Sequence, residues 1–360
     1  MIQSIYRENF TAAQKRDFVL SFTRERRLEI QQYLLDKISS KDPSYIKRTC
    51  EAFQISDKTV YRYLKEMESA GLLEKNGRTY TLHDDSHTWV LKREEFETAG
   101  EDRIYANTIL PLLKSLPQNV REIWDYAFTE MMNNAIDHAN ANHVEIVFQK
   151  NALHTIVIIS DDGIGIFKNI KEFFQLNTIE DAIEQLFKGK LTTDASRHSG
   201  EGIFFTSRML DQFGAVSDGL IFSYDQYDDI VHELKKPTVL PDWNTRAGTI
   251  IYMKLSNNSN RNSVDIFDRY ADVDNGFTRT HIPLKNLYDT YPVSRSQAKR
   301  LCRNLDKFTE VELDFSGVEK IGQGFAHELF VVYQNEHPTI RLLPINQNET
   351  VARMIQHVLR

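Results

Sequence analysis

Cysteine is scarce in this chain, and long apolar runs are missing from it. Only two of its 360 residues are cysteines, Cys50 and Cys302, and no His or Cys stands near either at metal-ligand spacing. We therefore expect neither a disulfide framework nor a zinc site. No apolar run approaches the roughly 18 to 20 residues of a membrane span, and the first residues, MIQSIYRENF, lack the basic and apolar segments of a signal peptide. These absences predict a cytoplasmic protein that does not enter a membrane.

The composition is ordinary for globular protein, but the charge is unevenly distributed. Hydrophobic residues make up 41% of the chain and charged residues 26%, in a length that suits two or three domains. Residues 1–82 contain 15 Lys and Arg against 11 Asp and Glu, a balance of +4, so with a total of −7 the remainder carries −11. A basic first segment joined to an acidic body is typical of a nucleic-acid-binding module fused to another unit.

The first segment, residues 1–86, has the pattern of a winged helix-turn-helix. Apolar spacing predicts a helix at about 24–38 and a short second helix that starts near Ser44. A third helix follows Ser56, a suitable N-cap, and ends near Gly71. The stretch EKNGRTYTL then predicts two short strands around an Asn-Gly pair, a strong hairpin signal.

The third predicted helix has one apolar face and one face suited to DNA. Val60, Leu64 and Met67 share the apolar face at helical spacing. The other face carries side chains that reach phosphates and base edges when a helix enters a major groove, namely Lys58, Thr59, Tyr61, Arg62 and Lys65. Winged helices also dock proteins, and a basic face is often only solvated. We favour DNA contact because the motif and the charge agree.

Residues 87–118 are acidic at their start and are interrupted by Pro111 and Pro117, so we expect a connector with one helix. The last segment, 273–360, alternates predicted helices and strands, which indicates a small α/β unit.

The second domain is predicted at residues 119–262. Apolar strands at 144–149 and 154–160 flank a polar turn, helices and glycine-rich loops follow, and a last strand lies at 248–256. Strands on one side and helices on the other indicate an α/β sandwich, closed by the polar run NNSNRN. The chain as a whole is expected to be a multidomain α/β (α+β) protein.

The stretch TEMMNNAIDHA in this domain is a helix with an unusual polar face. Its apolar stripe follows the spacing of one buried helix face and comprises Phe128, Met131, Met132, Ala135, Ile136 and Ala139. Glu130, Asn134 and Asp137 lie at i, i+4 and i+7 on the other side, where their polar groups can converge on one ligand. Asn133 does not share that face so closely, and we assign it only a structural role.

Three glycine-containing stretches follow this helix. The strand IVIIS runs directly into DDGIG at residues 161–165, where glycines allow close backbone approach to a ligand and the carboxylate of Asp161 can accept a hydrogen bond. Gly200 and Gly202 precede an apolar helix, whose free amides could hold phosphate oxygens. Gly248-Thr249 opens the last strand. Each motif is weak alone.

In this order, the motifs resemble the N, G1, G2 and terminal boxes of the GHKL ATPase superfamily, whose (Bergerat) fold is an α/β sandwich and which includes gyrase B, MutL, the heat-shock chaperones and histidine kinases. The chain has no GxxxxGK[ST], which excludes a P-loop nucleotide site. The resemblance covers about 150 residues and implies ATP and Mg²⁺ as cofactors.

The resemblance also implies roles for individual residues. Asn134 would coordinate Mg²⁺ that bridges the phosphates. Asp161 would accept a hydrogen bond from the adenine amino group, and the Thr249 hydroxyl would support Asp161. Glu130 would orient or deprotonate the attacking water. The segment 187–199 would be a lid. The other residues implied in nucleotide binding are Asp137, Gly163, Gly165, Lys190, Arg197, Gly200 and Gly202.

Hydrolysis is favoured over histidine phosphorylation. The segment before the ATP domain is too short for the helical hairpin that carries a phosphoacceptor histidine, and Asp137 stands where the kinases usually have a basic residue. The hydrolysing branch commonly dimerises through its nucleotide-bound lid, which implies an ATP-linked homodimer. A kinase acting on a separate partner and a nonhydrolysing sensor whose winged helix binds protein remain alternatives.

The last segment resembles a STAS-like (DUF4325-type) domain, on the stretches SRSQAKRL and VELDFSGVEKIGQGFAHELF. In related antagonists of anti-sigma factors a serine after the strand is phosphorylated, but Ile321-Gly322-Gln323-Gly324 has no hydroxyl here, and Ser316 lies one turn early. We therefore expect a module that docks a protein partner and has lost its phosphosite. The whole chain is expected to be a regulator in which ATP alters the relation between a DNA-binding head and this module.

Overall fold

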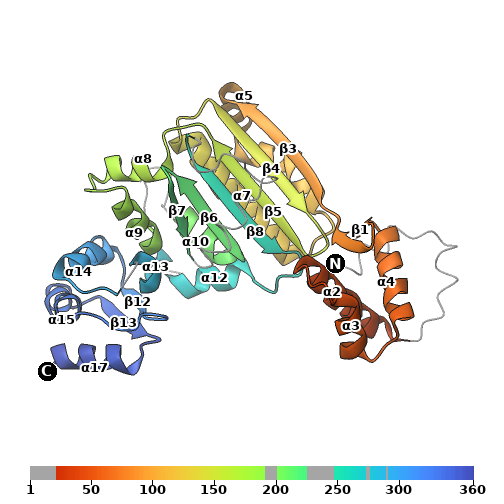
Figure 1. The fold of residues 1–360 in the computed structure, drawn as a ribbon. Helices are drawn as coiled ribbons and strands as arrows, with labels where there is room; N and C mark the ends of the chain where they lie inside the picture. The colour runs from red at the N-terminus through yellow and green to blue at the C-terminus, as the bar shows by residue number, and fades with distance from the viewer. Residues whose placement is uncertain (1–21, 191–200, 225–246, 273–275, 289–290) are drawn as a thin grey trace.

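The computed structural model describes residues 22–190, 201–224, 247–272, 276–288 and 291–360 (Figure 1). None of the helices in these ranges is long and apolar enough to cross a membrane.

Helices and a hairpin form the N-terminal unit, as predicted. Thr23 and Ser56 each accept a hydrogen bond from a backbone N–H in the first turn of the helix that they precede. Gly71, with φ of +70°, follows the third helix. The elements are α2 (Arg24–Ser39), α3 (Tyr45–Phe53), α4 (Asp57–Ser69), β1 (Leu73–Asn76) and β2 (Thr79–Leu82).

This unit has its own apolar core. Leu34 of α2 and Leu64 of α4 are fully buried in it, and Ala152, from the turn between two strands of the central sheet, packs into the same cluster. A half-buried ion pair joins Arg27 to Glu66 with a nitrogen to oxygen distance of 2.5 Å. The N-terminal unit therefore rests on one end of the central sheet.

A six-stranded antiparallel sheet with the order β3-β4-β5-β8-β6-β7 forms the centre of the molecule (Figure 1). Alternate residues of a strand face opposite sides, so Val157 and Ile159 join the large core under the helices while Ile156 and Ile158 join a smaller cluster on the other face. The strands are β3 (Asp85–Lys92), β4 (His143–Lys150), β5 (His154–Asp161), β6 (Gln212–Ser217), β7 (Leu220–Ser223) and β8 (Ile250–Ser256).

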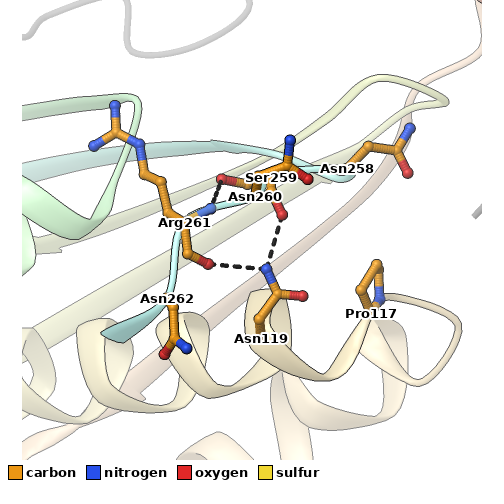
Figure 2. Close-up of a pocket in the computed structure, with 7 residues that line it drawn as sticks. All are labelled: Pro117, Asn119, Asn258, Ser259, Asn260, Arg261 and Asn262. Carbon is orange, nitrogen blue, oxygen red and sulfur yellow. Dashed lines mark hydrogen bonds between the residues drawn. The ribbon is translucent and has the colours of Figure 1, made fainter. Parts of the chain in front are cut away.

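One face of the sheet is covered by helices, of which α7 (Gln118–His138) is the longest. The other helices of this part of the chain are α5 (Arg93–Thr108), α6 (Leu110–Leu113), α8 (Ile166–Phe173), α9 (Glu180–Lys188) and α10 (Gly202–Met209). The polar run after β8 is tied to the start of α7, because the Asn119 amide donates to the carbonyls of Ser259 and Arg261 at 2.8 and 2.9 Å (Figure 2).

The predicted connector at 87–118 is wrong. Strand β3 pairs with β4 along its whole length, from Asp85 opposite Lys150 to Lys92 opposite His143. Helix α5 packs on α7, with the rings of Tyr105 and Phe128 5.5 Å apart. The strand alternates half-buried and exposed positions, as an edge strand does. The acidic and histidine-containing sequence at its start is typical of a loop, which explains the wrong prediction. This segment belongs to the central domain.

The C-terminal unit contains a three-stranded parallel sheet with the order β11-β12-β13. Each strand is followed by a helical segment, which agrees with the predicted small α/β unit. The elements are α12 (Ser263–Tyr270), β9 (Ala271–Asp272), β10 (Gly276–Phe277), β11 (Arg279–Pro283), α13 (Leu284–Leu287), α14 (Arg295–Cys302), η1 (Leu305–Lys307), β12 (Glu310–Asp314), α15 (Gln323–His327), η2 (Glu328–Tyr333), α16 (Gln334–Glu336), β13 (Arg341–Ile345) and α17 (Glu349–Val358).

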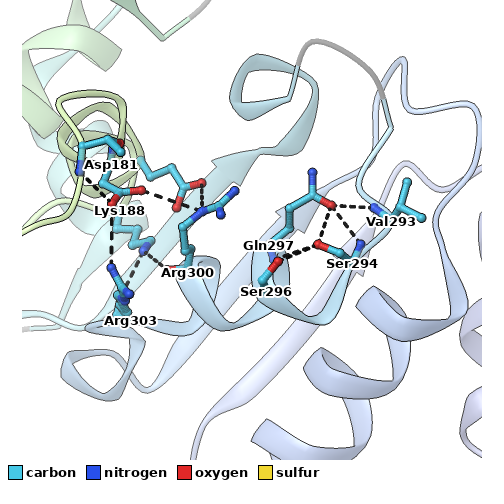
Figure 3. Close-up of polar contacts among 10 residues, drawn as sticks. Asp181, Lys188, Val293, Ser294, Ser296, Gln297, Arg300 and Arg303 are labelled. Carbon is cyan, nitrogen blue, oxygen red and sulfur yellow. Dashed lines mark hydrogen bonds and ion pairs between the residues drawn. The ribbon is translucent and has the colours of Figure 1, made fainter.

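The C-terminal unit is joined to the central domain through α9. The fully buried ammonium of Lys188 donates to the carbonyls of Arg300 and Arg303 at 3.1 and 3.0 Å (Figure 3). The Thr280 hydroxyl donates to the carbonyl of Lys188 at 2.7 Å. Apolar residues of both units belong to one continuous core.

Candidate nucleotide site

Helix α7 places its polar face as its sequence pattern predicts. Phe128, Met131 and Met132 are fully buried, while Glu130 and Asn134 are half-buried and Asp137 is exposed. The Asn134 amide nitrogen lies 3.9 Å from the sulfur of Met131, which is a weak contact. Asn134 therefore keeps its amide at the surface of the helix, one turn from Glu130.

Asp161 ends β5 and is buried, with 5% of its surface exposed. Its Oδ1 accepts hydrogen bonds from the backbone amides of Gly163 at 2.9 Å and Thr249 at 3.2 Å. Burial raises the pKa of this carboxyl to about 6, and these hydrogen bonds, with one from the Thr249 side chain, limit the rise. The Thr249 hydroxyl also accepts from the Ile166 amide at 3.0 Å, so Thr249 joins Asp161 to the start of α8.

The glycines beside Asp161 are required by close packing. A Cβ on Gly163 would lie 2.0 Å from the carbonyl oxygen of Ala139, at the end of α7, and one on Gly248 would lie 2.1 Å from the carbonyl oxygen of Asp161. Gly165 has φ of +85°, and its Cβ would meet the Ser217 hydroxyl. These contacts bring the ends of α7, β5, β6 and the start of β8 together around the Asp161 carboxylate.

The start of α10 lies against Glu130. A Cβ on Gly202 would be 2.2 Å from Oε2 of Glu130, so the carboxylate and the first turn of this helix are in contact. The amides of a first helical turn lack partners within the helix and favour anions. The proposed general base and the proposed phosphate-binding glycine are thus neighbours.

The first residues of the predicted lid, 187–190, are packed against the C-terminal unit. Phe187 and Lys188 are buried in the core that α9 shares with the C-terminal unit. Lys190, expected to contact phosphate, donates to the carbonyl of Lys307 at 2.8 Å and lies over the rings of Phe277 and Phe308. Burial lowers the pKa of Lys190, and Glu201 opposes the change. Arg197, Gly200 and the other residues of 191–200 lie outside the described residues.

Ser217 is a neighbour of the site that sequence reasoning missed. Its buried hydroxyl lies 2.9 Å from both the Gly248 carbonyl and Oδ2 of Asp218, beside Gly165. The only sequence signal is the Ser-Asp-Gly turn after a strand, which is common in proteins without a ligand.

The predicted DNA-facing side chains lie on the surface of α4. Lys58, Arg62 and Lys65 are exposed, and Tyr61 is 48% exposed. Thr59 is half-buried, and its hydroxyl lies 3.1 Å from that of Ser56, so it takes part in the helix cap. The adjoining β1-β2 hairpin adds two exposed basic residues, Lys75 and Arg78.

Two family profiles match the chain. The family of histidine kinase-, DNA gyrase B-, and HSP90-like ATPases matches residues 120–218. The STAS-like domain of unknown function (DUF4325) matches residues 297–352. No curated protein matches the chain.

The central part of the chain is therefore a GHKL ATPase domain. The C-terminal part is a STAS-like domain. The first of these families uses ATP, so the chain carries an ATP-using domain.

Proposed function

We propose that the chain is a cytoplasmic regulator that binds and hydrolyses ATP with Mg²⁺ and couples this cycle to DNA binding. The observation that carries the proposal is the buried Asp161 carboxylate, held by Gly163 and Thr249 at the point where four elements meet. A carboxylate fixed in this way can accept a hydrogen bond from an adenine amino group.

We assign Mg²⁺ binding to Asn134 and the positioning of the attacking water to Glu130. The described residues contain no group of three His, Cys, Asp or Glu side chains that could hold a metal. Mg²⁺ commonly binds one or two protein oxygens together with phosphate oxygens and waters, so the Asn134 amide oxygen suits it when ATP is bound. The Glu130 carboxylate, against Gly202, would hold the attacking water.

Helix α10 supports coupling between the site and the STAS-like domain. Its first residue, Gly202, touches Glu130. Arg208, near its other end, is buried and donates to the carbonyl of His281 in β11 at 3.0 Å. A shift of α10 on ATP binding would therefore act directly on the C-terminal sheet.

We propose that the N-terminal unit is a winged helix-turn-helix that binds DNA through α4, with the hairpin as its wing. The exposed basic side chains of α4 and of the hairpin support this assignment. We further propose an ATP-linked homodimer and a protein partner for the STAS-like domain. A phosphoacceptor side chain at Gly322 would be crowded, because a Cβ there would lie 2.3 Å from the carbonyl oxygen of Val293.

The experiment is an assay with ATP labelled on its γ-phosphate, using the wild type, Glu130→Ala and Glu122→Ala. Glu122 is exposed on the same helix and serves as the matched control. Release of free phosphate that falls about 100-fold or more in Glu130→Ala, and not in Glu122→Ala, is the expected result. Label retained on protein would favour the kinase alternative. ATP binding with neither phosphate release nor labelled protein would favour the nonhydrolysing sensor.

A further inference from the structure

A cavity of about 960 Å³ lies between the ATPase domain and the STAS-like domain, away from the residues around Asp161. Helix α9 and strand β7 form one wall, and α13, α14 and the segment after β12 form the other. Clefts of this size between domains are common places for small ligands.

Two buried side chains in the cavity lining each have one polar atom without a hydrogen bond to the residues that the structure describes. Glu184 and Tyr288 line the cavity and are each 8% exposed. Among the described residues, Oε2 of Glu184 and the Tyr288 hydroxyl have no hydrogen-bond partner. Buried polar groups are normally paired, so a ligand that reaches these two atoms would be stabilised by them.

The charges of the lining favour a cation. Its carboxylates are those of Glu180, Asp181, Glu184 and Glu319, and its cations are those of Lys285 and Arg300. Arg300 is already shared, because its Nε lies 3.7 Å from both Asp181 and Glu184. Burial raises the pKa of Glu184 despite Lys188 and Arg300 nearby. Oε2 of Glu184 makes no hydrogen bond among the described residues, so an ammonium group placed on this atom would stabilise the ionised carboxyl.

Apolar side chains from both domains complete the lining. They include Ile183 and Phe187 of α9, Leu287 of α13 and Val318 after β12. A ligand with a positive head and an apolar or aromatic body would match both parts of the cavity.

We propose that this cavity binds a small organic cation, a primary amine on an aromatic or aliphatic body, with its ammonium group on Glu184 and within reach of Tyr288. The ligand would touch Asp181 and Arg300, two of the charges that join the domains next to Lys188 (Figure 3). Binding would therefore strengthen the contact between the ATPase domain and the STAS-like domain. This site is separate from the ATP site and does not depend on the proposed hydrolysis.

The test is calorimetric titration of the full chain, without nucleotide, with tyramine and with agmatine. Two analogues of tyramine keep its ring and replace the ammonium with a hydroxyl (tyrosol) or a carboxylate (4-hydroxyphenylacetate). We expect one amine or both to bind with one site per chain, and tyrosol and the acid to bind about 10-fold more weakly or worse than tyramine.

Variants identify the site. Tyr288→Phe removes a hydroxyl that makes no hydrogen bond in the described structure, so it should fold normally and weaken amine binding about 3- to 10-fold. Glu184→Gln should weaken it about 10-fold or more, whereas Glu349→Gln, an exposed acid on α17, should not. Binding of neither amine, binding of the acid as tight as that of tyramine, or amine binding unchanged in both cavity variants would overturn the proposal. Titration of ATP into the same protein reports separately on the ATP site.

Discussion

Glu130 and Gly202 are in direct contact although 72 positions separate them, because α7 and α10 pack side by side under the sheet. A Cβ on Gly202 would come within 2.2 Å of the Glu130 carboxylate. The atom that would have to move is the end of a flexible side chain. A larger residue at position 202 should therefore displace the Glu130 carboxylate and have little effect on the stability of the fold.

Gly202→Ala is predicted to impair hydrolysis while leaving the protein folded. The new methyl group would displace the Glu130 carboxylate, so the rate of phosphate release should fall about 10-fold or more, with ATP affinity reduced much less. Phosphate release and equilibrium ATP binding measure the two effects. Gly324→Ala is the control, since its Cβ would make only ordinary contacts, the nearest at 3.5 Å. Equal losses in the two variants would contradict the proposed role of Glu130.

Gly163→Ala is predicted to destabilise the domain, in contrast to Gly202→Ala. Its Cβ would lie 2.0 Å from a backbone oxygen, that of Ala139, which cannot move without shifting the end of α7. We expect the free energy of unfolding to fall by about 2 kcal/mol or more, measured by urea denaturation. A variant as stable as the wild type would show that this contact is loose in solution.

Asp161 is predicted to destabilise the fold without nucleotide at neutral pH. Its folded pKa of about 6 lies above its ordinary value of 3.8. The folded protein therefore holds the proton more tightly than the unfolded chain, and this contribution to stability is lost as pH rises from about 3.8 to 6. Asp161→Asn should raise the stability at pH 7 by about 1 to 3 kcal/mol, because the amide oxygen can still accept from Gly163 and Thr249. Thermal unfolding at pH 4 and pH 7 measures this, and a larger gain at pH 4 than at pH 7 would contradict it.

The buried face of α7 could be predicted from the sequence because it depends on local periodicity. Phe128, Met131 and Ala135 are buried as the 3.6-residue spacing requires. The contact between Glu130 and Gly202 could not be predicted without the family resemblance, since it depends on how two distant helices pack. The position of Ser217 beside the site could not be predicted either, because a single hydroxyl at the end of a strand has no periodic signal.

Strand β3 and the start of the expected lid show where local reasoning failed. His87, Trp89 and Leu91 alternate correctly for a strand, but polar and acidic neighbours hide the pattern. Lys190 is predicted to contact phosphate, and Lys188 stands beside it in the same basic, glycine-containing stretch. The structure instead gives both ammonium groups carbonyl partners in the C-terminal unit, and such partners are not marked in a sequence.

Lys188→Ala is predicted to weaken the contact between the ATPase and STAS-like domains. The substitution removes two hydrogen bonds to the carbonyls of Arg300 and Arg303, and it leaves the buried Glu184 with less positive charge nearby. We expect a loss of about 3 kcal/mol in the free energy of unfolding, measured by urea denaturation. The exposed Lys168 on α8 is the matched control. Similar small losses for Lys168→Ala and Lys188→Ala would contradict this account of the junction.

Burial lowers the pKa of Lys188 to about 8 from an ordinary value of 10.5. The folded state therefore binds this proton more weakly than the unfolded chain does. The contribution of Lys188 to stability should rise as pH increases from about 8 to 10.5 and should be absent in Lys188→Ala. Unfolding curves at pH 7.5 and 10 measure the difference between the two proteins.

The double variant Lys58→Ala with Arg62→Ala is predicted to lose DNA binding. Both side chains are exposed on α4, and removal of two phosphate contacts should reduce the slope of log affinity against log salt by about 2. A fluorescence titration of duplex DNA at several salt concentrations measures it. Lys114→Ala with Arg353→Ala removes two exposed basic residues elsewhere and should leave the slope unchanged. DNA affinity that is the same in both double variants would favour protein docking by the N-terminal unit.

The most direct test of the central claim is equilibrium binding of ATP with Mg²⁺ to the wild type and to Asp161→Asn. The account predicts saturable binding with one site per chain in the wild type. It predicts a loss of about 10-fold or more in Asp161→Asn, because an acceptor for the adenine amino group is replaced, while the variant remains folded. A wild-type protein that binds no adenine nucleotide, or an Asp161→Asn variant that binds ATP as tightly as the wild type, would contradict it.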